Sequence, residues 1–219
     1  PHGNSVEKNQ AMKALGAELV EYGESFQEAR EEAGRRAEAE GLAMVPPFHP
    51  DLVLGVATYW HEFFSQHGDL DAVLVPVGMG SGICSAVLVR DLMGLSTRVY
   101  GVVAEQAPAY LRSFQAKQVI SQVSRTELAD GLACSVPDEQ ALGIMLAGVE
   151  DFFAVSEAEI AASMRLYMQT THNAAEGSAA AALAALRQQE AQFAQQKIGL
   201  PLTGGNVDSA ILAQVLAAP

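Results

Sequence analysis

The chain has 219 residues, of which 13 are basic and 26 are acidic, so its formal net charge at pH 7 is −13. A surface of that charge repels phosphate backbones and anionic lipid, which argues against nucleic acid or a membrane as a partner. No apolar run approaches the roughly 20 residues that a membrane-spanning helix needs. The two cysteines suit a reducing compartment and lack the spacing of metal ligands. We therefore expect a cytoplasmic globular protein without a metal site.

The beginning of the chain is rich in charge and has only short apolar segments. Ser5 is suited to cap a first helix, and a charged second helix is predicted over residues 26–40. Short strands are predicted over residues 17–22 and 42–45.

A change of character at Pro46-Pro47 indicates a domain boundary. We expect residues 1–47 to form part of a small domain and residues 48–219 to form a large one. Because the chain opens at Pro1 and enters a helix pattern almost at once, we also expect it to be a piece of a longer protein.

Strands and helices alternate through the rest of the chain, and the strands are almost continuously apolar, as in a sheet that is buried on both faces. Strands are predicted over residues 72–77, 98–104, 152–155 and 197–202, and helices over residues 51–66, 83–93, 107–118, 157–169, 176–189 and 209–217. This alternation predicts an α/β fold with three layers, in which helices cover both sides of a mostly parallel, twisted sheet.

The clearest candidate site is the run from Pro76 to Ile83, where a strand passes through a glycine-rich turn into a helix. Glycines let backbone amides converge, and the start of a helix adds free N–H groups and a partial positive charge, which together favour a phosphate group. A tight turn that binds nothing is the simpler interpretation. A dinucleotide site is another, with Glu105 as the acid after the next strand, but Ile83 stands where the third glycine of that motif is expected.

Three further segments are candidates. Thr203 follows the last strand, where ligands bind in parallel sheets, although a local turn explains it as well. His172, before a predicted helix, is a candidate general base, although a capping or packing role is simpler. Glu176 lies in the first turn of that helix, where a carboxylate favours the helix dipole without any further function. Asp130-Gly131 is typical of a turn.

Five segments, in order and along almost the whole chain, resemble motifs of the threonine/serine dehydratases, which are pyridoxal-phosphate enzymes of the tryptophan-synthase β fold (fold type II). They are the opening P-x-G-N-S through G-A-E-L-V, Pro76 to Ile83, Ala129 to Ala133, Glu176 to Ala180, and Leu202 to Asn206. The resemblance implies the large domain of that fold, together with part of its smaller domain.

The resemblance also implies roles for seven residues. Gly78, Met79, Gly80, Ser81 and Gly82 would hold the phosphate of pyridoxal 5'-phosphate. Thr203 would hydrogen-bond the pyridine nitrogen, and Glu176 would lie near cofactor and substrate. The intact enzyme would convert L-threonine or L-serine to a 2-oxo acid and ammonia, and family members commonly form homodimers or larger homo-oligomers.

The departures from the family pattern concern catalysis and metal binding. Family members have an S-F-K-like lysine that forms the Schiff base, and an S-x-G-N-H loop for the substrate carboxylate. Neither is found here: the four lysines, Lys8, Lys13, Lys117 and Lys197, match no Schiff-base position. We therefore assign no catalytic residue and expect this chain alone to be inactive.

The divalent-metal site of serine racemases is not supported, because Val103 and Ala109 stand at its acidic positions. The alternatives within the fold are a serine racemase, a threonine synthase or a β-replacing lyase. Outside it, a dinucleotide-binding domain and a non-catalytic homologue remain.

Overall fold

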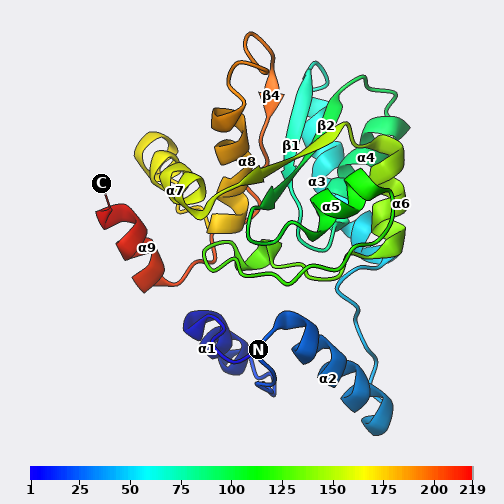
Figure 1. Ribbon diagram of the computed structural model, residues 1–219, viewed down its shortest axis with the longest axis vertical. Coiled ribbons are helices and arrows are strands. Elements are labelled where there is room, and N and C mark those ends of the chain that lie inside the picture. The colour runs from blue at the N-terminus through cyan, green and yellow to red at the C-terminus, as the bar shows by residue number, and fades with distance from the viewer. Residues whose placement is uncertain (219) are drawn as a thin grey trace. The chain divides into compact units, whose positions relative to one another are not determined.

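Four parallel strands form one sheet in the order β3-β2-β1-β4 (Figure 1). The structure, a computed structural model, describes residues 1–218. The strands are β1 (Ala72–Pro76), β2 (Arg98–Ala104), β3 (Asp151–Val155) and β4 (Ile198–Gly199). Ala72 of β1 pairs with Arg98 on one side and with Ile198 on the other. Because all strands run the same way, their carboxyl ends meet at one edge of the sheet, where ligands bind in such folds.

Helices cover both sides of this sheet, so the α/β class predicted from the sequence is confirmed (Figure 1). One side carries α3 (Pro50–Gln66), α4 (Ser81–Leu92), α5 (Ala109–Ala116) and α6 (Glu139–Gly148). The other side carries α7 (Glu157–Thr171) and α8 (Gly177–Gln188). A 3-10 turn, η1 (Asp130–Leu132), lies between α5 and α6.

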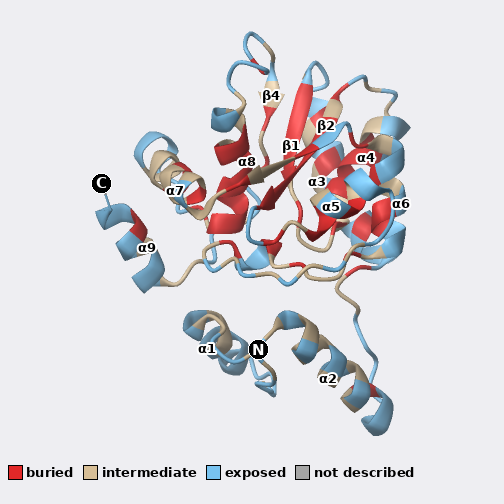
Figure 2. Cartoon of the chain, in the orientation of Figure 1, coloured by how far each residue is buried: buried red, intermediate tan, exposed pale blue. Residues whose placement is uncertain are grey.

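The core lies on both faces of the central strands, as the apolar strand sequences predicted (Figure 2). Residues Ala72 to Val75 of β1 are all buried. On one face Trp60 of α3 stacks on Phe64, with ring centroids 5.2 Å apart. On the other face α8 presents buried alanines, whose small side chains let this helix contact three of the strands closely. Each buried strand side chain contributes on the order of 25 cal/mol per Å² of apolar area removed from water.

The chain divides into two compact units, Pro47–Gly205, which contains the sheet, and a second unit made of Pro1–Pro46 together with Asn206–Pro219. The second unit contains α1 (Val6–Ala14), α2 (Phe26–Glu40) and α9 (Ser209–Ala217). The chain passes from one unit to the other between Pro46 and Pro47, where the sequence predicted a domain boundary. The predicted large domain, residues 48–219, differs from this division because the segment that begins at Asn206 belongs to the second unit.

Contacts at the start of α1 explain this difference. The Ser5 hydroxyl donates a hydrogen bond to Asp208, and the Val6 N–H donates to the same carboxylate at 3.1 Å. In return Glu7 accepts a hydrogen bond from the Ser209 N–H at 2.9 Å. The segment that begins at Asn206 therefore packs with the first residues of the chain, which are about 200 positions away in the sequence.

Two predicted strands, residues 17–22 and 42–45, are not strands in the structure, so these predictions were wrong. Leu15 and Val45, beside and within these segments, are 88% and 75% exposed. An apolar segment becomes a strand only when a neighbour completes its hydrogen-bond ladder, and the described residues place no such neighbour beside either segment. β4 is also shorter than the strand predicted over residues 197–202, because its pairing with β1 ends at Gly199.

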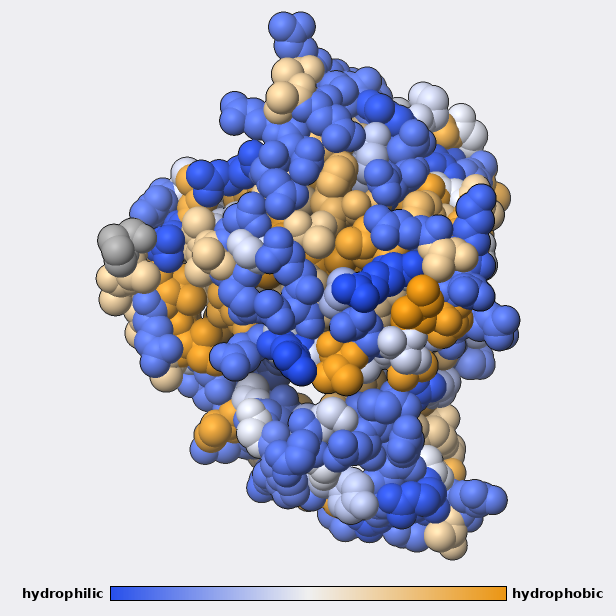
Figure 3. Space-filling view, in the orientation of Figure 1, coloured by the Kyte–Doolittle hydropathy of each residue, from blue (hydrophilic) through white to orange (hydrophobic). Residues whose placement is uncertain are grey.

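Polar and charged side chains cover most of the face shown in Figure 3, as expected from a net charge of −13. Within residues 1–218, no helix combines the length and the hydropathy that crossing a membrane requires.

Candidate cofactor site

A cavity of about 700 Å³ opens at the carboxyl edge of the sheet, within the unit Pro47–Gly205. Its wall is formed by the glycine-rich turn after β1, by one face of α3, by the start of α8 and by the segment after β4. All seven residues proposed from the sequence line it: Gly78, Met79, Gly80, Ser81, Gly82, Glu176 and Thr203. Segments more than 100 residues apart in the sequence therefore meet at one site.

The glycine-rich turn presents the amino end of α4 to this cavity. Gly80 is the N-cap residue, with a φ of +102°, and no side chain caps the helix. The first hydrogen bond of the helix runs from the Cys84 N–H to the Gly80 carbonyl at 3.0 Å. The three amides before Cys84 consequently have no acceptor within the helix, and they add to the positive end of its dipole. Such a helix start favours a phosphate group.

Close packing explains why glycine occupies two positions of the turn. A Cβ atom on Gly78 would overlap the carbonyl oxygen of Gly131, which belongs to the Ala-Asp-Gly segment. A Cβ atom on Gly80 would lie 2.6 Å from Cε of Met145 and 3.1 Å from Cβ of Ala141. The turn therefore lies pressed between η1 and α6, a close approach that only glycine permits.

Side chains from three helices fix the carbonyl groups of the turn. The Trp60 indole N–H donates to the Gly82 carbonyl at 2.9 Å. The Ser85 hydroxyl lies 2.6 Å from the Ser81 carbonyl, and the Tyr110 hydroxyl donates to the Met79 carbonyl at 2.8 Å. With these carbonyls held by the protein, the amides of the turn remain for a ligand.

Glu176 and Thr203 line the same cavity from the start of α8 and from the segment after β4. The Glu176 N–H donates to the Gly204 carbonyl at 3.1 Å, which ties the N-cap of α8 to the segment after β4. The Glu176 carboxylate lies directly over Gly204, because a Cβ atom there would be 2.8 Å from the carboxylate carbon. Glu176 and Thr203, which carry a carboxylate and a hydroxyl, therefore line the cavity from adjacent backbone segments.

Sequence reasoning missed the contribution of α3. Val56, Tyr59 and Phe63 line the cavity at helical spacing of three and four residues. The apolar periodicity of residues 51–66 predicted the helix, but it does not distinguish a face that packs in the core from one that borders a cavity. Tyr59 also carries a buried hydroxyl oxygen without a hydrogen-bond partner among the described residues, and burial raises its pKa.

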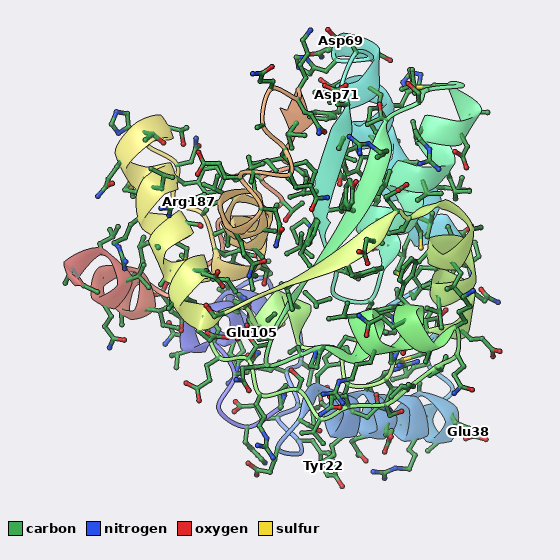
Figure 4. The ribbon with its side chains drawn as sticks, turned by 45° about the horizontal axis from the view of Figure 1, so that its top comes forward. Tyr22, Glu38, Asp69, Asp71, Glu105 and Arg187 are labelled. Atoms are coloured by element: carbon green, nitrogen blue, oxygen red, sulfur yellow. The ribbon has the colours of Figure 1, made fainter. Side chains whose placement is uncertain are left out.

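Other candidates lie outside the site. His172 ends α7 as its C-cap and does not border the cavity. Asp130 accepts a hydrogen bond from the adjacent Gly131 N–H at 2.8 Å, as expected for a turn, and does not border the cavity, whereas Gly131 does. Glu105 directly follows β2, at the end of the sheet opposite Asp69 and Asp71 (Figure 4), and it is not among the residues of the cavity wall. The dinucleotide alternative consequently lacks its acidic residue at the described cavity.

The residues of the cavity fit the phosphate of pyridoxal phosphate. The uncapped amino end of α4 offers amides to a dianion, and the glycines leave room for its oxygens beside the backbone. Thr203 and Glu176 add a hydroxyl-bearing and a carboxylate-bearing residue to the lining of the same cavity. No lysine borders the described cavity, and no cluster of three or more His, Cys, Asp or Glu side chains suited to a metal ion occurs within residues 1–218.

Comparison with known proteins agrees with this chemistry. The chain is 33% identical over 208 residues to an L-threo-3-hydroxyaspartate ammonia-lyase of Pseudomonas sp. This alignment covers 94% of this chain and 65% of the relative. It is 34% identical over 206 residues to phenylserine dehydratase of Ralstonia pickettii, covering 93% of this chain and 63% of that enzyme. The chain thus spans less than two thirds of the length of these relatives.

Solved structures show the same fold over nearly the whole chain. The processed form of threonine deaminase isoform 2 from Solanum lycopersicum superposes with a TM-score of 0.89 at 27% identity, covering 100% of this chain and 65% of that one. The threonine deaminase from T.th. superposes with a TM-score of 0.84 at 30% identity, covering 94% and 68%. The family model described as "Pyridoxal-phosphate dependent enzyme" matches residues 1–204. The chain belongs to the family of pyridoxal-phosphate dependent enzymes.

Proposed function

We propose that the cavity binds pyridoxal 5'-phosphate, with its phosphate at the start of α4 and its ring toward Thr203. The observation that carries this proposal is that the uncapped helix start and the polar segment after β4 line one and the same cavity. The backbone amides of Gly78 to Gly82 and the Ser81 hydroxyl bind the phosphate dianion. The favourable end of the α4 dipole adds to that attraction.

Thr203 positions the ring by a hydrogen bond between its hydroxyl and the pyridine nitrogen. A neutral hydroxyl, unlike a carboxylate, leaves this nitrogen largely unprotonated. Glu176, whose carboxylate lies over Gly204 beside Thr203, orients the ring and the bound substrate from the same wall. When bound, the cofactor withdraws electrons from the substrate Cα and weakens its bonds, while the chain supplies binding and orientation.

For the longer polypeptide we propose an ammonia-lyase that acts on a 3-hydroxy amino acid, with L-threonine or L-serine as the first candidates. Three relatives are named for L-threo-3-hydroxyaspartate, phenylserine and L-threonine. These three amino acids all carry a hydroxyl group on the carbon next to Cα. The Cα proton and this hydroxyl leave as water, and a second water then replaces the amino group, so that the products are a 2-oxo acid and ammonia. A serine racemase of Schizosaccharomyces pombe, 27% identical over 200 residues, supports racemisation as the second candidate.

We further propose that the chain alone does not catalyse this elimination, because no lysine borders its described cavity. The longer polypeptide is expected to be a cytoplasmic homo-oligomer. A coupled assay for 2-oxo acids, together with chiral analysis of the remaining amino acid, separates elimination from racemisation. Turnover of threonine by the 219-residue chain itself would contradict the proposed inactivity.

Cofactor binding is testable with the chain as it stands, because Trp60 is its single tryptophan, is fully buried and bonds the Gly82 carbonyl. Titration with pyridoxal phosphate should quench Trp60 fluorescence to saturation. Pyridoxal, which lacks the phosphate, should bind at least about tenfold more weakly. A Trp60→Phe variant controls for the origin of the signal. Absence of saturable quenching, or saturation by NADH in place of pyridoxal phosphate, would overturn the proposal.

A further inference from the structure

The hydroxyl group of Tyr110 on α5 is saturated by two backbone partners. It donates to the Met79 carbonyl at 2.8 Å and accepts from the Asp138 N–H at 3.0 Å. Tyr110 is 1% exposed and does not border the cavity. The hydroxyl therefore connects the glycine-rich turn to the N-cap residue of a neighbouring helix, without bordering the cavity itself.

The Asp138 end of this connection is held by further hydrogen bonds. Asp138 is the N-cap of α6, and its carboxylate accepts from the N–H groups of Gln140 and Ala141 at 2.9 and 3.0 Å. Because the Asp138 N–H occupies a lone pair of the phenol oxygen, the phenol hydrogen is directed to Met79. Burial, the main cause, raises the pKa of Tyr110, so the phenol remains a donor throughout the physiological pH range.

The Met79 carbonyl determines the direction of the next amide. The structure contains no cis peptide bond among the described residues, and in a trans peptide the C=O and N–H groups point to opposite sides. With the Met79 carbonyl turned to Tyr110, the Gly80 N–H turns away from Tyr110, toward the cavity that Gly80 borders. A flipped peptide would present the negative carbonyl to the phosphate instead.

Glycine lowers the cost of such a flip, because a residue without a Cβ atom occupies either sign of φ readily. The turn has three glycines within five residues, and Gly80 has a φ of +102°. The turn's own sequence therefore does not hold this peptide in one orientation. Among the described contacts, the hydrogen bond from Tyr110 is the one that reaches the Met79 carbonyl.

We propose that Tyr110 is a positioning residue for phosphate recognition, which holds the Met79–Gly80 peptide with its N–H directed at the anion. This inference rests on the proposed function of the cavity. It assigns a specific role to a side chain that touches neither cofactor nor substrate, and it predicts an effect confined to ligands that carry the phosphate.

The test compares Tyr110→Phe with the unaltered chain, using pyridoxal phosphate and pyridoxal as paired probes and Trp60 fluorescence as the readout. Tyr110→Phe should weaken binding of pyridoxal phosphate about tenfold and leave binding of pyridoxal within about twofold. Tyr167→Phe on α7, which also removes a hydroxyl from a partly buried tyrosine but lies outside the cavity wall, should change neither affinity. Circular dichroism verifies that each variant is folded.

A second variant keeps the test independent of how well the phenylalanine variant folds. Tyr110→4-aminophenylalanine places an N–H donor near the lost hydroxyl, so its ratio of pyridoxal phosphate to pyridoxal affinity should return to within about threefold of the unaltered chain. A ratio that stays tenfold lower contradicts the proposal. So does an unchanged affinity in Tyr110→Phe, or an equal loss for both probes. If the unaltered chain binds neither probe, the cofactor site itself is refuted and this proposal falls with it.

Discussion

The carbonyl oxygen of Gly131 lies against the Cα atom of Gly78, so that no side chain of any size fits between them. This contact joins the Ala-Asp-Gly segment to the glycine-rich turn, although the two are more than 50 residues apart. It sets how closely η1 approaches the start of α4 and therefore shapes the cavity wall.

Gly78→Ala should distort this wall. Its methyl group would overlap backbone rather than a flexible side chain, so the turn must shift. We expect a loss of about 1–3 kcal/mol in the free energy of unfolding, the range for overpacked sites. We also expect at least tenfold weaker binding of pyridoxal phosphate. Urea unfolding and Trp60 quenching measure the two effects.

Gly143→Ala is the matched control, because Gly143 lies inside α6 and a Cβ atom there meets nothing within 4 Å. It should raise the free energy of unfolding by about 0.5–1 kcal/mol, since alanine is the better helix former. Equal behaviour of the two variants would show that the contact with Gly131 is unimportant.

Asp208→Ala should loosen the start of α1. It removes the acceptor for the Ser5 hydroxyl and the Val6 N–H, and losses of this kind at a helix start cost about 0.5–2 kcal/mol. Hydrogen exchange at the α1 amides should become faster, while the amides of β1 remain protected. Glu38→Ala, on α2 (Figure 4), serves as a control with no expected effect on α1. Unchanged exchange in α1 would contradict the grouping of α9 with the first residues.

Glu159→Gln should change the acid stability of the chain. Burial alone would raise the pKa of Glu159, but hydrogen bonds from the Ser156 N–H and hydroxyl and from Gln188 outweigh it and lower the pKa below 4.5. A lowered folded-state pKa stabilises the fold above the unfolded value, and this stability is lost as the pH falls through the folded value. Because solvent still reaches and screens the group, we expect a deficit of only about 0.5 kcal/mol at pH 7.

The deficit of Glu159→Gln should shrink as the pH falls below about 4.5, where the unaltered carboxylate also becomes protonated. Denaturant titrations at pH 7 and pH 3 measure it. Glu190→Gln, at an exposed position after α8, is the control. A deficit that grows toward low pH would have the wrong sign for this account.

Cys84 should be unreactive toward thiol reagents in the folded chain. It is fully buried in α4, and burial, with a smaller effect of Asp138, raises its pKa to about 12. Thiolate is the reactive form, so little is present at pH 8. Cys134 is buried as well. Ellman's reagent should therefore detect no rapidly reacting thiol in the native chain and two after denaturation; a rapid native reaction would contradict the packing of α4.

Much of the secondary structure was predictable because its signals are local. Ser25 and Gly41 bracket α2 where the sequence indicates, and Ser156 forms a capping box with Glu159 at the start of α7. The apolar run 98–104 is β2, with the same bounds as predicted. The order of the family motifs also led to seven of the residues that line the cavity, since motif and spacing are properties of the chain itself.

Contacts between distant residues were not predictable in this way. The sequences of residues 17–22 and 42–45 predicted strands, but a strand also needs a hydrogen-bonding neighbour, which no local pattern supplies. Likewise the Tyr110 hydroxyl reaches the Met79 carbonyl, and Asp208 reaches Ser5, only after the chain has folded. The sequence by itself thus determined most of the helices, though not α6 (Glu139–Gly148), together with the central strands and the glycine-rich turn, because these depend on neighbouring residues. The tertiary structure alone decided which side chains hold that turn and where the last helix packs, because both depend on atoms that folding brings together.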